Sequence, residues 1–147
     1  MKFMKKKEQD YSLYTAAANA GITAQQMQEL FTAQQGEEDA VYMYEQLAKV
    51  VRDEADRKAF LRLAGDEKRH SNVFKKYTGT DVKANPAKGI LVPLMYKVIG
   101  KKRVYKIIAK GEYDAAEKYK HIIDDFPEVV EVMNDEVHHG DAVLGLL

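Results

Sequence analysis

The chain repeats one spaced pattern of acidic, aromatic and imidazole residues, once in each half. The first copy reads Glu37-x-x-Ala40-x-x-x-Tyr44, then Asp66-Glu67-x-x-His70. The second copy reads Glu112-x-x-Ala115-x-x-x-Tyr119, then Asp135-Glu136-x-x-His139. Residues three apart share one face of a helix, so each Glu-x-x-His can present both side chains together. Four carboxylates and two imidazoles in this order are the ligand set of a dinuclear metal site in a four-helix bundle.

Length and composition are compatible with such a bundle. The 147 residues suit one domain that can bury a hydrophobic core. The chain contains only three prolines and nine glycines, so long helices are possible. The absence of cysteine excludes disulfides, thiolate metal sites and thiol nucleophiles. Lys+Arg and Asp+Glu balance at 23 each, which gives no indication of a nucleic-acid partner. With no segment long enough to cross a bilayer, we expect a cytoplasmic protein.

Turn and cap signals divide the chain into helices. Thr23 with Gln26 resembles a capping box, Thr78-Gly79 ends a helix, and Pro86 can open one. The long helices are expected over 23–52, 55–77, 101–124 and 127–144, with a short apolar helix over 90–99. The sequence therefore predicts an all-α, antiparallel four-helix bundle over 23–147, with one long crossover that contains an extra short helix. Residues 1–22 are expected to form an N-terminal helical extension.

The glutamates of the repeat fall inside apolar stripes. Offsets of three, four and seven residues mark one helix face. Around Glu67 that face reads Phe60, Leu63, Ala64, Glu67, His70 and Phe74, and around Glu136 it reads Val129, Val132, Met133, Glu136, His139 and Val143. Glu37 and Glu112 sit in similar stripes. A buried ionised carboxylate costs several kcal/mol unless it is paired or binds a metal, so this placement favours metal binding.

The spacing between the glutamates adds a geometric argument. In an antiparallel hairpin, two residues lie level when the turn falls midway between them. The midpoint of Glu37 and Glu67 is Arg52, within a charged stretch suited to a turn, and that of Glu112 and Glu136 is Asp124, shortly before Pro127. Each hairpin therefore places a lone glutamate level with a Glu-x-x-His.

We hypothesise that Glu67 and Glu136 bridge two cations about 3.5–4 Å apart. Glu37 with His70, and Glu112 with His139, would be the terminal ligands. Carboxylate and imidazole ligands suit iron, manganese and zinc.

Four further residues could support these ligands. Asp66 and Asp135 could accept the outer imidazole N–H of a histidine across the bundle, which fixes the tautomer. The hydroxyls of Tyr44 and Tyr119 could bond to ligand carboxylates or relay a proton or electron, although both tyrosines also suit a plain core position.

Other polar residues fall off the stripes. Glu38, Glu45, Glu117, His121 and His138 are expected at the surface. The lysines of 2–7 and the basic run 101–106 are interpreted as solvated faces, with contact to a membrane as the alternative. The apolar segment 90–99 is expected to pack across the bundle or to form a dimer interface, with a membrane-surface role as the alternative.

Over residues 23–144 the quoted motifs resemble the ferritin-like di-iron carboxylate proteins, and most closely the rubrerythrins. The resemblance implies two iron ions, with manganese or zinc as alternatives, and oxidation of Fe(II) by hydrogen peroxide or dioxygen. It also implies a homodimer, with a ferritin-like cage as the alternative, and because the chain has no cysteine any electrons must come from an external donor.

The chain departs from the rubrerythrin pattern at two points. It lacks the cysteine-ligated rubredoxin domain, and Ala115 stands where rubrerythrins place an extra glutamate, which puts their peroxidase cycle in doubt.

The apolar-then-basic stretch 90–103 resembles the rubrerythrin-like domain that precedes a membrane iron-transport domain in some bacterial proteins. The chain could be a stand-alone relative of that domain or part of a longer protein. A non-catalytic iron-sensing or iron-delivery module is therefore the alternative, and a helical interaction protein with a vestigial site is a third.

Overall fold

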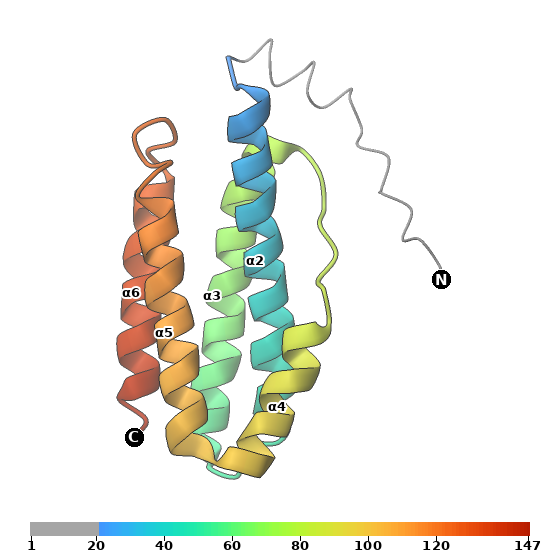
Figure 1. Cartoon of the computed structure of the whole chain (residues 1–147), viewed down its shortest axis with the longest axis vertical. Coiled ribbons are helices and arrows are strands. Elements are labelled where there is room, and N and C mark those ends of the chain that lie inside the picture. Colours follow the sequence, from blue (N-terminus) through green and yellow to red (C-terminus); the bar gives the residue numbers. More distant parts are fainter. Residues whose placement is uncertain (1–20) are drawn as a thin grey trace.

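Two antiparallel helical hairpins lie side by side in the computed structural model, which describes residues 21–147 (Figure 1). The helices are α2 (Ala24–Ala48), α3 (Glu54–Thr78), α4 (Ala87–Ile99), α5 (Lys101–Tyr119) and α6 (Val129–Leu144). The described residues contain no strand. The predicted four-helix bundle with a short helix in its crossover is therefore confirmed. The predicted N-terminal extension lies, apart from residues 21 and 22, outside the described residues.

The first hairpin begins and ends at the predicted signals. Thr23 and Gln26 form a reciprocal capping box with bonds of 2.8 and 3.1 Å, which satisfies free N–H groups of α2. Asp53 caps α3 through the amides of Ala55 and Asp56. Gly79 ends α3 in the left-handed conformation, which glycine adopts without strain. The predicted helix 23–52 was too long, because the chain leaves α2 after Ala48.

The second hairpin has a longer connection than expected. The helix predicted over 101–124 ends at Tyr119, and the one predicted from Pro127 begins at Val129. Residues 120–128 form successive turns instead. Ile122 and Phe126 are buried in this connection, so their packing holds it against the end of the bundle.

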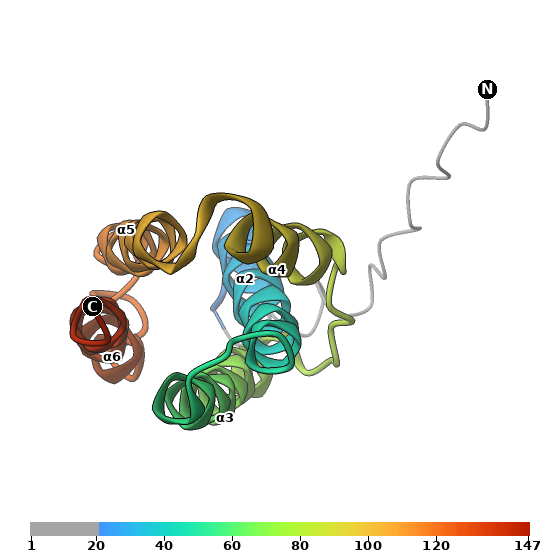
Figure 2. The ribbon, with the colours of Figure 1, turned by 90° about the horizontal axis from the view of Figure 1, so that it is seen from below.

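The crossover places α4 against α2, on the side opposite α3 (Figure 2). A Cβ atom at Gly89 would lie 2.2 Å from the ring of Tyr42, so glycine permits this close approach. Pro93 is buried inside α4, and the helix continues through it. Gly100 then turns the chain into α5 with φ +86° and ψ 164°.

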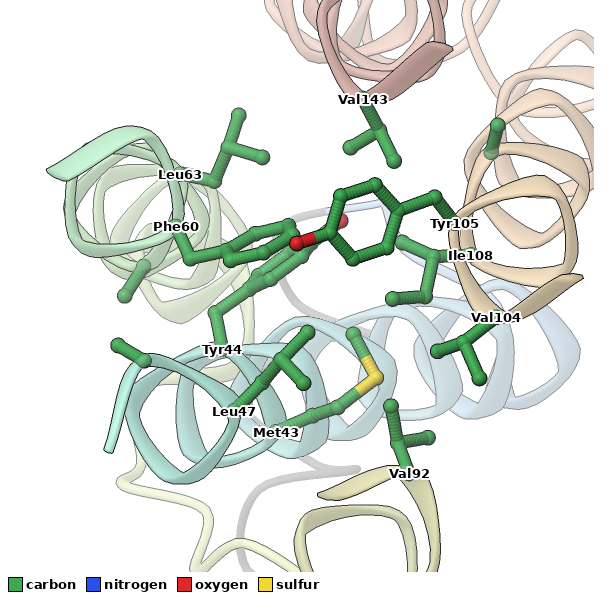
Figure 3. Packing of buried hydrophobic residues seen from close by; sticks show 13 residues of the cluster. Met43, Tyr44, Leu47, Phe60, Leu63, Val92, Val104, Tyr105, Ile108 and Val143 are labelled. Atoms are coloured by element: carbon green, nitrogen blue, oxygen red, sulfur yellow. The ribbon is translucent and has the colours of Figure 1, made fainter. Parts of the chain in front are cut away.

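The hairpins meet through large side chains. Among the four bundle helices, Cα atoms of the two hairpins come within 8 Å only between α3 and α6. Two apolar clusters fill the space. The first contains Tyr44, Phe60, Leu63, Tyr105, Ile108 and Val143 (Figure 3), and the second contains Leu30, Phe74, Tyr119, Val129 and Val132. Along each helix the motif glutamate lies between a residue of one cluster and a residue of the other. The carboxylates therefore form a polar layer between two apolar ones.

The conformation of Gly100 predicts a stability difference between two glycines of the same region. Gly100→Ala should destabilise the protein by about 1–3 kcal/mol, because its backbone region is essentially restricted to glycine. Gly111→Ala is the matched control: Gly111 is exposed within α5 with open space at its Cβ, and alanine there should stabilise by about 0.5–1 kcal/mol. Denaturant unfolding of both variants measures the difference, and equal stabilities would contradict it.

Candidate metal centre

Each of the four bundle helices contributes one buried carboxylate to the same polar layer. Glu37 on α2, Glu67 on α3, Glu112 on α5 and Glu136 on α6 are at most 6% exposed. The two imidazoles, His70 and His139, are buried with them. The structure thus brings together all six residues that the sequence singled out, and the level register expected of each hairpin is present.

His70 points its Nδ1 atom into a group of carboxylates. That atom lies 2.9 Å from Glu136 Oε1 and 3.6 Å from Glu67 Oε2. It also lies 3.6 Å from Glu37 Oε2. This imidazole therefore faces the lone glutamate of its own hairpin and the Glu-x-x-His glutamates of both hairpins.

His139 has the equivalent surroundings in the second hairpin. Its Nδ1 atom lies 2.7 Å from Glu67 Oε1 and 3.6 Å from Glu136 Oε1. Glu112 Oε2 is 3.8 Å away. Glu67 and Glu136 thus face both imidazoles, whereas Glu37 and Glu112 each face one. The arrangement is therefore approximately twofold symmetric.

The outer ring nitrogens are held across the bundle. His70 Nε2 lies 2.9 Å from Asp135 Oδ2, and His139 Nε2 lies 3.0 Å from Asp66 Oδ2. A carboxylate accepts a hydrogen bond, so each pair places the proton on Nε2. A neutral imidazole then directs its Nδ1 lone pair toward the glutamates.

The two tyrosines link the hairpins in the same crossed way. Tyr44 of α2 donates its hydroxyl to Glu112 Oε1 of α5. Tyr119 of α5 donates to Glu37 Oε1 of α2 at 2.5 Å. Burial and the neighbouring carboxylates raise the pKa of both hydroxyls well above the ordinary value, so both remain donors at neutral pH.

Five buried oxygen and nitrogen atoms in this layer have no hydrogen-bond partner. They are Glu67 Oε1 and Oε2, Glu136 Oε1, His70 Nδ1 and His139 Nδ1. Leaving such atoms unsatisfied in a dry interior costs about 1–3 kcal/mol each, and more for charged groups. Glu67, His70, Glu136 and His139 can each direct one ligand atom to within 4.8 Å of the others. Their carboxylate and imidazole donors fit a divalent metal ion, so this group could hold one.

Without a cation, the same groups share protons. Burial, followed by the charge of Glu67, raises the pKa of Glu37. Burial is also the main reason that the pKa of Glu136 is raised to about 9. Burial alone would raise the pKa of Glu67, but the neighbouring Glu37 and the two histidines that face it outweigh burial and lower that pKa.

The histidines hold their protons more tightly than usual. Burial alone would lower the pKa of His139, but the carboxylates of Glu112 and Glu67, which face its Nδ1, raise it to about 11. The pKa of His70 is raised in the same way. Metal ligands must be deprotonated, so a cation that entered this layer would displace protons.

A surface groove reaches one edge of the layer. Its volume is about 400 Å³, and Asp66, His139, Arg62 and His138 are among its lining residues on α3 and α6. The sequence placed His138 at the surface, which is correct, but gave no sign of the groove. Two helices must be set side by side before such a depression exists.

One of the residues expected in solvent has a structural role. The Glu38 side chain is only 12% exposed, so its predicted solvation was wrong. It accepts hydrogen bonds from Ser71 at 2.6 Å and Lys68 at 2.7 Å, which joins α2 to α3 beside the site. Glu45, Glu117, His121 and His138 are exposed, as predicted.

A bundle in which each of the four long helices supplies a buried carboxylate around two crossed histidines defines the ferritin-like carboxylate class. The sequence model of the Rubrerythrin family matches residues 28–142, and the chain belongs to this family. No curated protein and no solved structure matches the chain significantly. Within the described part of the chain, every helix is too short or too polar to cross a membrane.

The shared protons predict how the stability of the metal-free protein depends on pH. Glu136 moves from an ordinary pKa of 4.5 to about 9, and His139 from 6.5 to about 11. The native state therefore keeps protons that the unfolded chain has released. This stabilisation is present at low pH and is lost as pH rises through the native pKa values.

Between pH 6.5 and 9, the unfolding free energy of chelator-treated protein should fall, by up to about 1.4 kcal/mol per pH unit for each retained proton. The lowered pKa of Glu67 acts only below 4.5 and leaves this window unaffected. Urea unfolding at a series of pH values measures the slope. Saturating Zn(II) should flatten it, and a stability that rises with pH without metal would contradict the prediction.

The crossed aspartates predict an effect on metal affinity. Asp135→Ala removes the acceptor of His70 Nε2–H and should weaken Fe(II) or Zn(II) binding about 10–100-fold. Asp114→Ala, which removes only an exposed partner of Lys110, is the control and should leave affinity unchanged. Anaerobic chelator competition measures both, and equal affinities would contradict a role for Asp135.

Proposed function

We propose that this chain binds two iron ions in the polar layer and oxidises Fe(II) with hydrogen peroxide or dioxygen. The observation that carries the proposal is that five buried carboxylate oxygens and imidazole nitrogens converge in this layer without hydrogen-bond partners. Iron is the metal typical of the Rubrerythrin family, and the donor set suits it.

The distances support a specific assignment of ligands. Glu67 and Glu136 each face both histidines and are proposed as the bridges. Glu37 with His70, and Glu112 with His139, are proposed as the terminal ligands. When bound, the iron pair supplies two electrons, which with two protons convert one hydrogen peroxide into two waters.

The protein's own residues prepare the layer for this chemistry. Asp66 and Asp135 keep a proton on each Nε2 atom and leave Nδ1 available. Tyr44 and Tyr119 hold the two lone glutamates by their hydroxyl protons. The two apolar clusters above and below the layer exclude bulk water, which strengthens every charge interaction inside it.

Replacing one imidazole tests the assignment. His139→Ala should reduce bound iron from two ions per chain to at most one, and should slow Fe(II) oxidation at least about tenfold. The neighbouring His138→Ala is the matched control, because His138 is exposed and does not face the carboxylates. Both variants are compared by iron analysis and oxygen consumption after circular dichroism confirms folding. Parent-like values for His139→Ala would refute the ligand assignment.

Stopped-flow mixing separates the enzyme from the iron-sensing or iron-delivery alternative. Anaerobic Fe(II)-loaded protein is mixed with hydrogen peroxide, and the ferric absorbance is followed. Rapid oxidation at two Fe(II) per peroxide supports the proposed reaction. Fe(II) that remains reduced, yet can be removed reversibly by a chelator, supports the non-catalytic module instead.

A further inference from the structure

The balanced net charge of the chain conceals a sharp segregation along the sequence. From Val82 to Gly111 there is no Asp or Glu, and the basic residues are Lys83, Lys88, Lys97, Lys101, Lys102, Arg103, Lys106 and Lys110. From Glu112 to the C-terminus there are ten Asp or Glu and only two Lys. The basic stretch covers α4 and the first half of α5.

The outer face of α4 is apolar and uncovered. Ile90, Leu91, Leu94 and Val98 are 64%, 54%, 56% and 73% exposed. Offsets of one, four and eight residues place them on one side of the helix. The opposite side is buried, with Gly89 fitted against Tyr42 of α2. Four large aliphatic side chains on one helix face form a patch of the kind that marks an interaction surface.

Free cations border this apolar face. Lys88 and Lys97 on α4, and Lys102, Arg103 and Lys106 on α5, are exposed. Within residues 21–147 none of these five has an acidic partner. By contrast, Lys101 is paired with Asp56 and Lys110 with Asp114. Unpaired cations therefore lie beside the exposed aliphatic residues.

The two segments that connect α5 to its neighbours lie at opposite ends of the bundle. The junction of α4 and α5 forms one end, and the α5–α6 connection forms the other (Figure 1). That connection carries the exposed Asp124, Asp125 and Glu128. An anionic surface would therefore attract the basic residues of α4 and early α5 and repel these three carboxylates.

We propose that the outer face of α4, with the basic start of α5, docks on the surface of an anionic lipid bilayer. A helix with aliphatic residues on one side and flanking lysines lies in the interface plane, with its apolar face among the acyl chains. At 13 residues α4 is about 20 Å long, so it can lie in the interface but cannot span a core of about 30 Å.

Charge and apolarity together favour lipid over other occupants. A second copy docked through the same face would bring two sets of unpaired cations together. A nucleic acid would match the cations but would leave Ile90, Leu94 and Val98 without an apolar partner. An anionic bilayer offers phosphate groups in its headgroup layer and acyl chains directly beneath them, so it matches both features of the face.

The test is flotation of the full chain with vesicles. Vesicles of equal parts phosphatidylcholine and phosphatidylglycerol should bind the protein, and vesicles of phosphatidylcholine alone should bind it at least tenfold less. Raising the salt to 1 M, where the Debye length is about 3 Å, should release most of the protein.

Matched variants separate the two features of the face. Leu94→Ser should weaken binding about tenfold or more. Lys97→Gln with Lys102→Gln should weaken it about 25-fold, at about fivefold per cation. The controls are Leu61→Ser, which is 50% exposed on α3, and Lys58→Gln, also exposed on α3. They should bind like the parent, and residues 1–20 are identical in every protein tested.

Three outcomes would overturn the proposal. One is the absence of binding to the anionic vesicles at low salt. Another is binding that the α4 variants leave unchanged. A third is a protein dimer in sedimentation that Leu94→Ser dissociates while vesicle binding is absent, which would assign the face to a second copy. None of these variants touches the polar layer, so iron binding is scored separately.

Discussion

The burial of four glutamates and two histidines in one layer is the constraint on which this fold depends. Ionised carboxylates repel one another in a dry interior, and neutral ones give up their ability to bind a cation. The raised pKa values of Glu37, Glu136 and His139 show that protons fill this role when no cation does. The two apolar clusters on either side hold the helices, so the layer itself need not contribute stability.

The two hairpins repeat the same set of polar residues, and this symmetry explains how a short chain builds the polar layer. Each hairpin supplies one lone glutamate, one Glu-x-x-His, one aspartate and one tyrosine. The supporting bonds cross between hairpins: Asp135 holds His70, and Tyr44 holds Glu112. Neither hairpin alone therefore supplies the hydrogen bonds that support its own histidine and lone glutamate. The same crossing explains why the backbones can stay far apart, since the long side chains of the layer and of the aromatic core span the distance between them.

The distribution of charged residues on the surface is not explained by the interior. Its charges cancel in total, yet residues 82–111 carry eight cations and no Asp or Glu, whereas residues 112–147 carry ten Asp or Glu and two Lys. A metal layer inside a bundle does not require this distribution, and neither does the packing of α4 on α2. The exposed aliphatic residues of α4 and their unpaired cations therefore belong to a separate interaction, which we assign to a lipid surface.

Spacing in the sequence determined the helices, their pairing and the six residues of the layer. Three-residue offsets and a midway turn are local properties of a helix and a hairpin, so they can be read from the chain. The sequence could not determine that Glu38 would be covered by Ser71, that α5 would end at Tyr119, or which aspartate would meet which histidine. Those outcomes depend on how far apart and at what rotation the two hairpins settle. That distance is decided by side-chain volumes packed together in three dimensions, and no local pattern encodes it.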